Sequence, residues 1–303
     1  MQFQDLNVVV WNTQVKASRS EFNSKNWRFC KKVIYSLILQ NIDLIGLIEV
    51  DETCVGYLNS IFERFNLPYK VADGTQQRRN TSFDTCIIYR TDKFLLSKTE
   101  HQQDCENTDL YVHGKQSKSG QKFVFFDIMN SQFLSFVMIH WPSPMTQGIE
   151  KLRIKVADNL RRHLDVWLQE NNNIIIAGDF NTEPFCDSLT EQLYFLREPN
   201  ATKRGPNGFE YFFNPSWGFL NIPPPVYNPY DYEILGTYFY KGDRAKHWHN
   251  FDQVIFSKNL IDGDVGWKYS KESLKILGYF DITNQKERWS DHLPIKFSLK
   301  WVS

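Results

Sequence analysis

Short apolar runs alternate along this chain with longer segments in which apolar residues recur every three or four positions. Residues 8–11 are a continuous apolar run, and residues 42–48 are apolar apart from Asp43 and Gly46; short runs of this kind form buried strands. Between them, apolar side chains repeat at helical spacing over residues 27–38. The start of the chain therefore predicts a β-helix-β unit.

The same alternation continues toward the other end of the chain. A second helix is expected at about 55–65, and the longest helical pattern spans about 149–169. Residues 123–126 and 133–139 are separated by polar residues in the manner of a hairpin. Further strands are expected at 86–89, 173–177, 251–257 and 295–301. The pattern predicts a layered α/β fold.

From about 198 to 250 the regular pattern fails, because prolines and glycines lie among Phe, Tyr, Trp and Asn. A long loop packed over the core by its own aromatic side chains explains this composition better than a separate domain. The segment could also form one wall of a substrate cleft. We expect residues 1–303 to form a single domain with this insertion.

Composition narrows the class of protein. Hydrophobic residues make up 42% of the chain and aromatic residues 16%, which excludes disorder of the whole chain. The 35 basic and 35 acidic side chains give a formal net charge of zero, whereas proteins that hold long duplexes are usually basic. A polyanionic substrate is still compatible with this balance, because a bound metal ion can supply positive charge.

Five cysteines form no CxxC pair and leave an odd count, which indicates reduced thiols. The first residues resemble no signal sequence, and no apolar run approaches the length of a membrane span. We expect a cytoplasmic, monomeric protein with no membrane partner.

Polar side chains stand where the expected strands begin or end. Because the ends of adjacent strands converge in a layered fold, these groups could meet in one cleft. The residues are Asn12, Glu49, His140, Asp179, Asn181, Asp252, Asp291 and His292.

Their chemistry suits one reaction. Carboxylates with an amide are the hard oxygen ligands that Mg²⁺ or Mn²⁺ prefers, and no cluster holds enough Cys and His for zinc. An ion held by Glu49 would neutralise a phosphate, while an Asp orients or deprotonates the attacking water. A His paired with an Asp keeps a defined tautomer and acts as a proton donor or electrostatic clamp. The implied reaction is hydrolysis of a phosphate ester.

Six short motifs, in order along nearly the whole chain, resemble those of the endonuclease/exonuclease/phosphatase superfamily. The resemblance implies a four-layer α/β/β/α sandwich, the deoxyribonuclease-I-like fold, with the site at the sheet edges. Each motif alone is weak, whereas six in sequence are specific. They are Val10-Trp11-Asn12, Leu47-Ile48-Glu49, Ile139-His140, Gly178-Asp179-Phe180-Asn181, Phe251-Asp252-Gln253-Val254 and Ser290-Asp291-His292-Leu293-Pro294.

The resemblance also implies roles at the metal. Glu49 would be the principal ligand of Mg²⁺ or Mn²⁺, with Asn12 and Asp291 near the ion. Asp179 would position or activate the attacking water.

The remaining roles concern the phosphate. Asn181 and His140 would bind the scissile group, and Asp252 would pair with His292 beside it. After Asn12 this chain has Thr13-Gln14, whereas abasic-site endonucleases of the superfamily usually carry an Asp at the second of these positions, and a Tyr in place of His140. The sequence therefore resembles the His-bearing branches, namely deoxyribonuclease-I-like nucleases, sphingomyelinases and inositol-polyphosphate phosphatases.

Taken singly, most of these residues have a structural explanation as well. Asn12 could be a strand-ending amide in a turn, and Glu49 part of a solvated acidic edge. Asp179 and Asp291 could cap a following segment. His140 could donate to a loop carbonyl. For Asp84, which precedes the strand at 86–89, the resemblance suggests support of the phosphate-binding His, but the alignment leaves its place open.

Three functions remain open, of which a nuclease acting on DNA or RNA is favoured. A phosphatase acting on a small phosphorylated metabolite or inositol phosphate would share every catalytic residue, and a binding module would not need the full set. Candidate phosphate contacts are Arg78, Arg79, Lys115, Lys118, Lys203 and Arg204, although solvated loop charge is the commoner role of such residues. Rings on which bases could stack lie at 211–217 and at Trp248, with a small loop core as the alternative.

Overall fold

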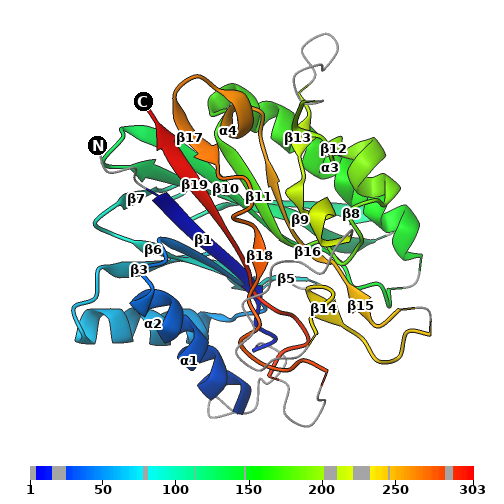
Figure 1. The fold of residues 1–303 in the computed structure, drawn as a ribbon, viewed down its shortest axis with the longest axis horizontal. Coiled ribbons are helices and arrows are strands. Elements are labelled where there is room, and N and C mark those ends of the chain that lie inside the picture. The colour runs from blue at the N-terminus through cyan, green and yellow to red at the C-terminus, as the bar shows by residue number, and fades with distance from the viewer. Residues whose placement is uncertain are drawn as a thin grey trace.

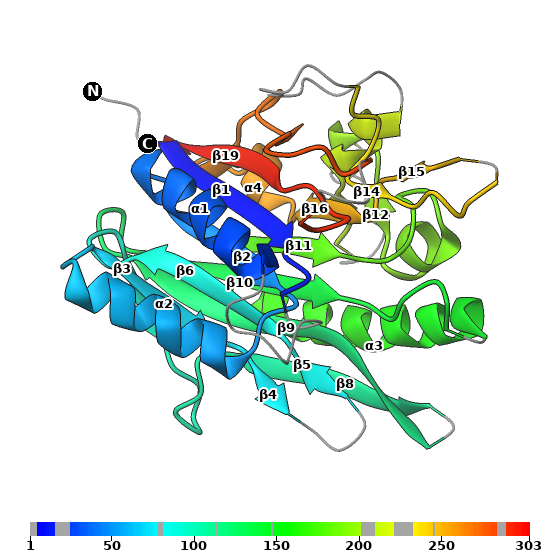
Figure 2. The same ribbon diagram turned by 90° about the horizontal axis from the view of Figure 1, so that it is seen from below.

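A computed structural model describes residues 5–15, 25–77, 81–112, 114–146, 148–200, 210–220, 233–244, 246–283 and 289–303. Two large β-sheets pack face to face, and helices cover both outer faces (Figures 1 and 2). No helix in this described part combines the length and the apolarity needed to cross a bilayer.

The first sheet carries the two ends of the chain side by side. Strand β1 pairs in parallel with β2 and antiparallel with β19, as expected for a β-helix-β unit closed by the last strand. In spatial order the strands are β17 (Gly266–Tyr269), β19 (Ile295–Val302), β1 (Asp5–Asn12), β2 (Leu44–Ile48), β6 (Thr85–Arg90) and β3 (Tyr69–Asp73), and β18 (Lys275–Ile276) also pairs with β19.

Helices α1 (Lys25–Leu39) and α2 (Glu52–Arg64) cover the outer face of this sheet (Figure 1). The side chain of Asp51 caps α2 by accepting a hydrogen bond from the backbone N–H of Cys54 at 2.9 Å. Such a cap satisfies one of the N–H groups that a helix start leaves without an internal partner. It also fixes the turn that leads from β2 past Glu49.

The second sheet is built around the predicted hairpin. Strands β9 and β10 are antiparallel, whereas β10 and β11 are parallel. Helix α3 (Ile149–Glu170) connects β10 to β11. In spatial order the strands are β12 (Phe195–Leu196), β13 (Phe212–Phe213), β16 (Asp252–Phe256), β11 (Ile174–Asp179), β10 (Gln132–His140), β9 (Lys115–Asp127) and β7 (Phe94–Ser97), and β8 (Glu106–Val112) also pairs with β9.

Two apolar cores hold the layers together. The larger one includes Val10 and Ile45 of the first sheet together with Phe136 and Ala177 of the second. The smaller one packs the outer face of the second sheet against Leu160 and other residues of α3. The order helix, sheet, sheet, helix confirms the predicted four-layer sandwich.

The segment predicted as a long loop contains short regular elements where the structure describes it. Strand β13 pairs with β12 and β16 and so extends the second sheet. Aromatic side chains do pack within the segment, as expected, but backbone pairing binds it to the sheet as well. The other elements are the 3-10 helix η5 (Pro215–Leu220) and the paired strands β14 (Tyr238–Phe239) and β15 (Trp248–His249). Elsewhere lie β4 (Gln76–Gln77) paired with β5 (Ser82–Phe83), the π-helix η2 (Ser188–Gln192) and helix α4 (Asn259–Asp262).

Candidate active site

Strand register brings the predicted polar residues to one edge of the sandwich. Parallel pairing of β10 with β11 sets His140 opposite Asp179, and antiparallel pairing of β11 with β16 sets Asp179 opposite Asp252. In the first sheet, Asn12 pairs with the last residue of β2, so that Glu49 follows directly. The ends of β1 and β11 lie at the same edge (Figure 2).

Asn12 joins the two sheets. Its Nδ2 donates to Glu49 Oε1 at 3.1 Å and to Asp179 Oδ2 at 3.1 Å, while its Oδ1 accepts from the backbone N–H of Gln14 at 3.2 Å. The side chain is fully buried. A buried amide with all these partners has one orientation, so Asn12 fixes the two carboxylates relative to each other.

The loop after β11 is shaped around Asp179. Gly178 has φ +145°, and a Cβ at this position would lie 2.1 Å from the carbonyl oxygen of Ile139, so only glycine fits. Asp179 Oδ1 accepts the backbone N–H of Asn181 at 2.8 Å, and Oδ2 accepts Asn181 Nδ2 at 3.1 Å. Burial raises the pKa of Asp179, against the opposing effect of His292. The carboxylate is therefore a stronger base than an exposed Asp.

His292 forms a buried pair with Asp252. The Nδ1 and Oδ2 atoms are 2.8 Å apart, and both side chains are almost completely buried. On the other side of the ring, Nε2 lies 3.7 Å from Asp179 Oδ2 and 3.7 Å from Asp291 Oδ1. Burial lowers the pKa of His292, but the charges of Asp252 and Asp179 outweigh it and raise the pKa from 6.5 to about 10. The imidazole is therefore positively charged at neutral pH.

A second histidine stands at the opposite side of the cluster. His140 Nδ1 lies 3.0 Å from Asp84 Oδ1 and 3.1 Å from Lys118 Nζ, and the lysine and Asp84 are 2.5 Å apart. His140 Nε2 lies 3.8 Å from Glu49 Oε1. The structure thus gives Asp84 the place beside His140 that the alignment left open. It also adds Lys118, on β9, directly to the site.

Strand β14 was missed as part of the site. The hydroxyl of Thr237 accepts the backbone N–H of Asp252 at 3.0 Å. The Tyr238 ring packs 4.6 Å from the His292 ring and stacks on Phe251 with centroids 5.1 Å apart. Two-residue strands carry too few positions for a periodic signal, so nothing in the sequence pattern distinguished Tyr238 from the other aromatic residues of the insertion.

Contacts of 2.8 to 3.8 Å connect all eight predicted side chains into one network. Some candidates fall elsewhere. Arg78, Arg79, Lys203 and Arg204 lie outside the described residues, as does the side chain of Lys115. The ring of Trp248 packs 5.2 Å from that of Phe239.

The donor set fits a hard divalent cation. The partly exposed Glu49 and the largely buried Asp291 present carboxylate oxygens at the sheet edge, beside the amide of the buried Asn12. Among those residues no group of three His, Cys, Asp or Glu side chains forms a preassembled metal cage. Mg²⁺ commonly binds one or two carboxylates and keeps several waters, so it does not need such a cage.

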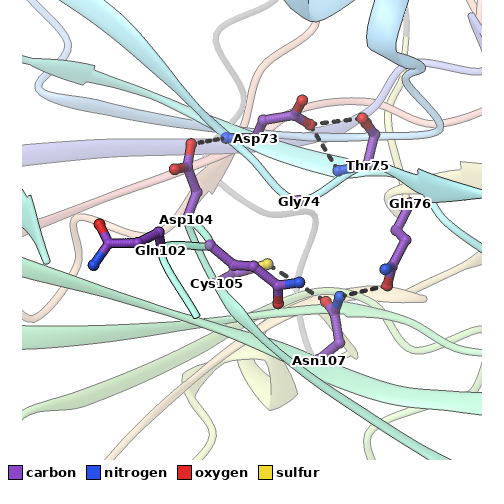
Figure 3. A pocket seen from close by; sticks show the side chains of 9 residues that line it. Asp73, Gly74, Thr75, Gln76, Gln102, Asp104, Cys105 and Asn107 are labelled. Carbon is purple, nitrogen blue, oxygen red and sulfur yellow. Dashed lines mark hydrogen bonds between the residues drawn. The ribbon is translucent and has the colours of Figure 1, made fainter. Parts of the chain in front are cut away.

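A separate polar pocket of about 210 Å³ lies beside β4 and β8. Figure 3 shows Asp73 and Thr75 on one side of it and Asn107 on another, with Asp73 Oδ1 accepting from the Thr75 hydroxyl at 2.6 Å. None of the eight predicted site residues lines it. Its lining is Asp73, Gly74, Thr75, Gln76, Gln102, Gln103, Asp104, Cys105 and Asn107.

Comparison with known proteins supports the fold. The model of the Endonuclease/Exonuclease/phosphatase family matches residues 16–297. No curated protein matches the chain in sequence.

Solved structures of low sequence identity share its fold. The human Nocturnin catalytic domain with bound sulfate superposes with a TM-score of 0.62 at 14% identity, covering 99% of this chain and 98% of that one. D. rerio TDP2 with a single-strand DNA product superposes with a TM-score of 0.61 at 14% identity, covering 98% of this chain and 99% of that one. ANGEL2, a 2',3'-cyclic phosphatase, in complex with adenosine-2',3'-vanadate superposes with a TM-score of 0.61 at 12% identity, covering 99% of this chain and 97% of that one.

Proposed function

Because the chain belongs to the endonuclease/exonuclease/phosphatase family, we propose that it is a Mg²⁺- or Mn²⁺-dependent phosphodiesterase acting on DNA or RNA. The observation that carries this proposal is the contact network between both sheets, in which Asn12 links Glu49 to Asp179. A binding protein has no need to bury three carboxylates around a charged imidazole, since each buried charge costs stability unless it is used or paired.

In this proposal Asp179 is the general base. Its pKa is raised by burial, which brings it closer to the operating pH and increases its affinity for the proton of an attacking water. The two hydrogen bonds from Asn181 fix the orientation of the carboxylate. The water would lie within hydrogen-bond reach of Asp179 and attack the phosphorus in line with the leaving oxygen.

His292 acts as a fixed positive charge. Asp252 holds its ring through Nδ1 at 2.8 Å, which leaves the protonated Nε2 directed at the centre of the site. Because the pKa is raised to about 10, Nε2 donates to a non-bridging phosphate oxygen throughout the neutral range. As negative charge accumulates on that oxygen in the transition state, the interaction becomes stronger.

On the other side, His140 and Lys118 bind the same phosphate. The ammonium of Lys118 next to Nδ1 supplies positive charge, while Nε2 of His140 faces the cluster near Glu49. A divalent ion held by Glu49, with Asn12 and Asp291 nearby, would neutralise the phosphate and stabilise the leaving oxygen. We propose that residues 1–303 act as one catalytic domain, because both sheets contribute to the site.

We also propose a cytoplasmic location. All five cysteines are free, and four of them are buried, as suits a reducing compartment. The monomeric state stays a prediction.

The test compares turnover of fluorescent single-stranded DNA, duplex DNA, RNA and a panel of phosphomonoesters. Each is incubated with Mg²⁺, Mn²⁺ or EDTA, with the wild type, Asp179→Asn and the exposed control Asp264→Asn. We expect chelator-sensitive cleavage of a nucleic acid that Asp179→Asn abolishes and Asp264→Asn leaves intact. Phosphate release from monoesters alone would instead identify a phosphatase, and inactivity on every substrate would favour a binding module.

A further inference from the structure

One of the large aromatic side chains beside the catalytic loops is strongly exposed. Phe185 follows Asp179 by six residues and is 49% exposed. Its ring meets the half-buried Trp217 of η5 edge to face, with centroids 6.4 Å apart. Exposing a Phe to water is unfavourable, so an aromatic pair formed between the segment that follows Asp179 and η5 suggests a ligand that covers it.

Cationic side chains flank both rings. The guanidinium of the exposed Arg197 lies 5.9 Å from the Trp217 ring centroid, and the ammonium of Lys246 lies 5.7 Å from that of Phe185. Lys246 is also paired with Glu183 at 2.5 Å, which balances its charge. Arg197 forms no ion pair with any residue in the described ranges, so its charge is available to a phosphate.

Hydrogen bonds tie this aromatic pair to the catalytic strands. Gln253, next to Asp252, accepts from Asn214 Nδ2 at 2.9 Å and donates to the carbonyl of Thr182 at 2.8 Å. The backbone N–H of Val254 donates to the Ser216 hydroxyl at 3.0 Å. The segments that carry Phe185 and Trp217 are thus held in a fixed position relative to the catalytic residues.

We propose that Phe185, Trp217 and Arg197 form a platform for the unpaired nucleotides next to the scissile phosphate, so that the substrate strand is single-stranded there. Bases stack on exposed aromatic faces without sequence preference, and an adjacent guanidinium binds the backbone. Bases of an intact duplex are already stacked on each other and cannot use such a platform. This inference rests on the proposed nuclease function and specifies its substrate.

The chain offers a matched control in Phe133. It is also 49% exposed and also meets another ring, that of Phe126 at 5.1 Å. It lies near the start of β10, whereas His140 ends that strand, which separates the two by about 23 Å at a rise of about 3.3 Å per residue. Phe133→Ala and Phe185→Ala therefore remove equally exposed rings, and only Phe185→Ala removes one near the proposed catalytic residues.

The experiment measures binding of a fluorescein-labelled oligothymidylate by anisotropy in EDTA, where cleavage cannot occur. We expect Phe185→Ala to weaken binding roughly 5- to 160-fold, the range for one lost base-stacking contact. Phe133→Ala should leave it unchanged. If Phe185→Ala and Phe133→Ala bind the oligothymidylate with equal affinity, the proposed platform is wrong.

Arg197 is tested through salt dependence. Arg197→Gln should reduce the slope of log K against log[salt] by about 0.7, the value for one phosphate contact on a single strand. Arg162→Gln, on the outer surface of α3, serves as control. An unchanged slope for Arg197→Gln would remove the arginine from the platform.

Hydrolysis of bis(p-nitrophenyl) phosphate separates this inference from the proposed function. This small diester reaches the catalytic groups without extending over Phe185, so Phe185→Ala should hydrolyse it at the wild-type rate while losing activity on the oligonucleotide. If the wild type cleaves single strands and Phe185→Ala cleaves them equally well, only the platform is wrong. If the wild type cleaves neither the diester nor any nucleic acid, the proposed function is wrong and the platform falls with it.

Discussion

The buried pair of Asp252 and His292 should show a coupling free energy far above that of a surface ion pair. Displacing the pKa of His292 from 6.5 to about 10 corresponds to a preference of about 5 kcal/mol for the charged imidazole. Asp252 is the largest of the causes that raise this pKa, and Asp179 is the next. We therefore assign about 2 to 3 kcal/mol to the pair itself, within the range for buried contacting groups.

The assay is a double-mutant cycle of urea unfolding at pH 7 with Asp252→Asn, His292→Gln and the double variant. The replacements keep a hydrogen bond between amides, so that the cycle isolates mainly the charge interaction. The control cycle uses Asp158 and Arg162, an i,i+4 pair 3.1 Å apart with both side chains more than half exposed. For that pair we expect about 0.5 kcal/mol or less.

The pH dependence provides a second check. A histidine whose pKa is raised by folding stabilises the native state fully below its unfolded pKa, and this contribution is lost as the pH rises through the folded pKa. For His292 the loss therefore spans pH 6.5 to about 10. The coupling should be close to its full value at pH 7 and small at pH 10.5. A coupling at pH 7 no larger than that of Asp158 and Arg162 would refute the reasoning.

Three further predictions follow from other parts of the fold. If Glu49 holds the metal as proposed, Glu49→Gln removes a carboxylate ligand and should raise the Mg²⁺ concentration for half-maximal rate by at least about tenfold. The exposed Glu63→Gln serves as control, and an unchanged metal titration for Glu49→Gln would contradict this. Gly178→Ala should lower the free energy of unfolding by about 3 kcal/mol or more, since the new Cβ meets backbone. The control Gly114→Ala is also at positive φ but has nothing within 4 Å of the new Cβ, so it should lower the free energy of unfolding by only about 1 kcal/mol. If urea unfolding gives equal losses for Gly178→Ala and Gly114→Ala, the backbone relieves the clash at Gly178. Ellman's reagent should label Cys186 rapidly in the native protein and the other cysteines only in urea, because burial blocks access to these thiols and raises their pKa. Fast labelling of all five thiols in the native protein would contradict this. The four slow thiols are Cys30, Cys54, Cys86 and Cys105.

Much of the fold could be read from the sequence because the central strands are buried on both faces. Strand β2 is a continuous apolar run, β11 is apolar up to its final Asp179, and the long helix α3 has an unbroken 3.6-residue period. Strands β8 and β17 gave no such signal. In β8 only Thr108 is buried and the other residues are partly or fully exposed, and β17 is only four residues long. Edge strands of this kind depend on the neighbour to which they pair.

The candidate site was predictable only where chemistry coincided with a strand end. Asp179 and Asp252 stand at opposite ends of neighbouring strands, so strand boundaries alone placed them together. Lys118 lies near the start of the long strand β9 and was a candidate phosphate contact, with solvated charge as the commoner role, whereas its contact with His140 at 3.1 Å appears only in the structure. Its role depends on the register and twist of two strands, which no local pattern encodes. Tyr238 was missed because its two-residue strand carries too few positions for a periodic signal.

The pairing of β1 with β19 has a consequence for synthesis on the ribosome. Strand β1 is made first, yet its antiparallel neighbour follows more than 280 residues later, and the Asp291-His292 pair comes directly before that neighbour. At roughly 5 to 20 residues per second, β1 waits on the order of 15 to 60 s for this partner. A nascent chain therefore holds Asn12, Glu49 and Asp179 before His292, whose charge the proposed reaction requires, has been made. Such an order of appearance would keep a nuclease silent while it is still attached to the messenger RNA being translated.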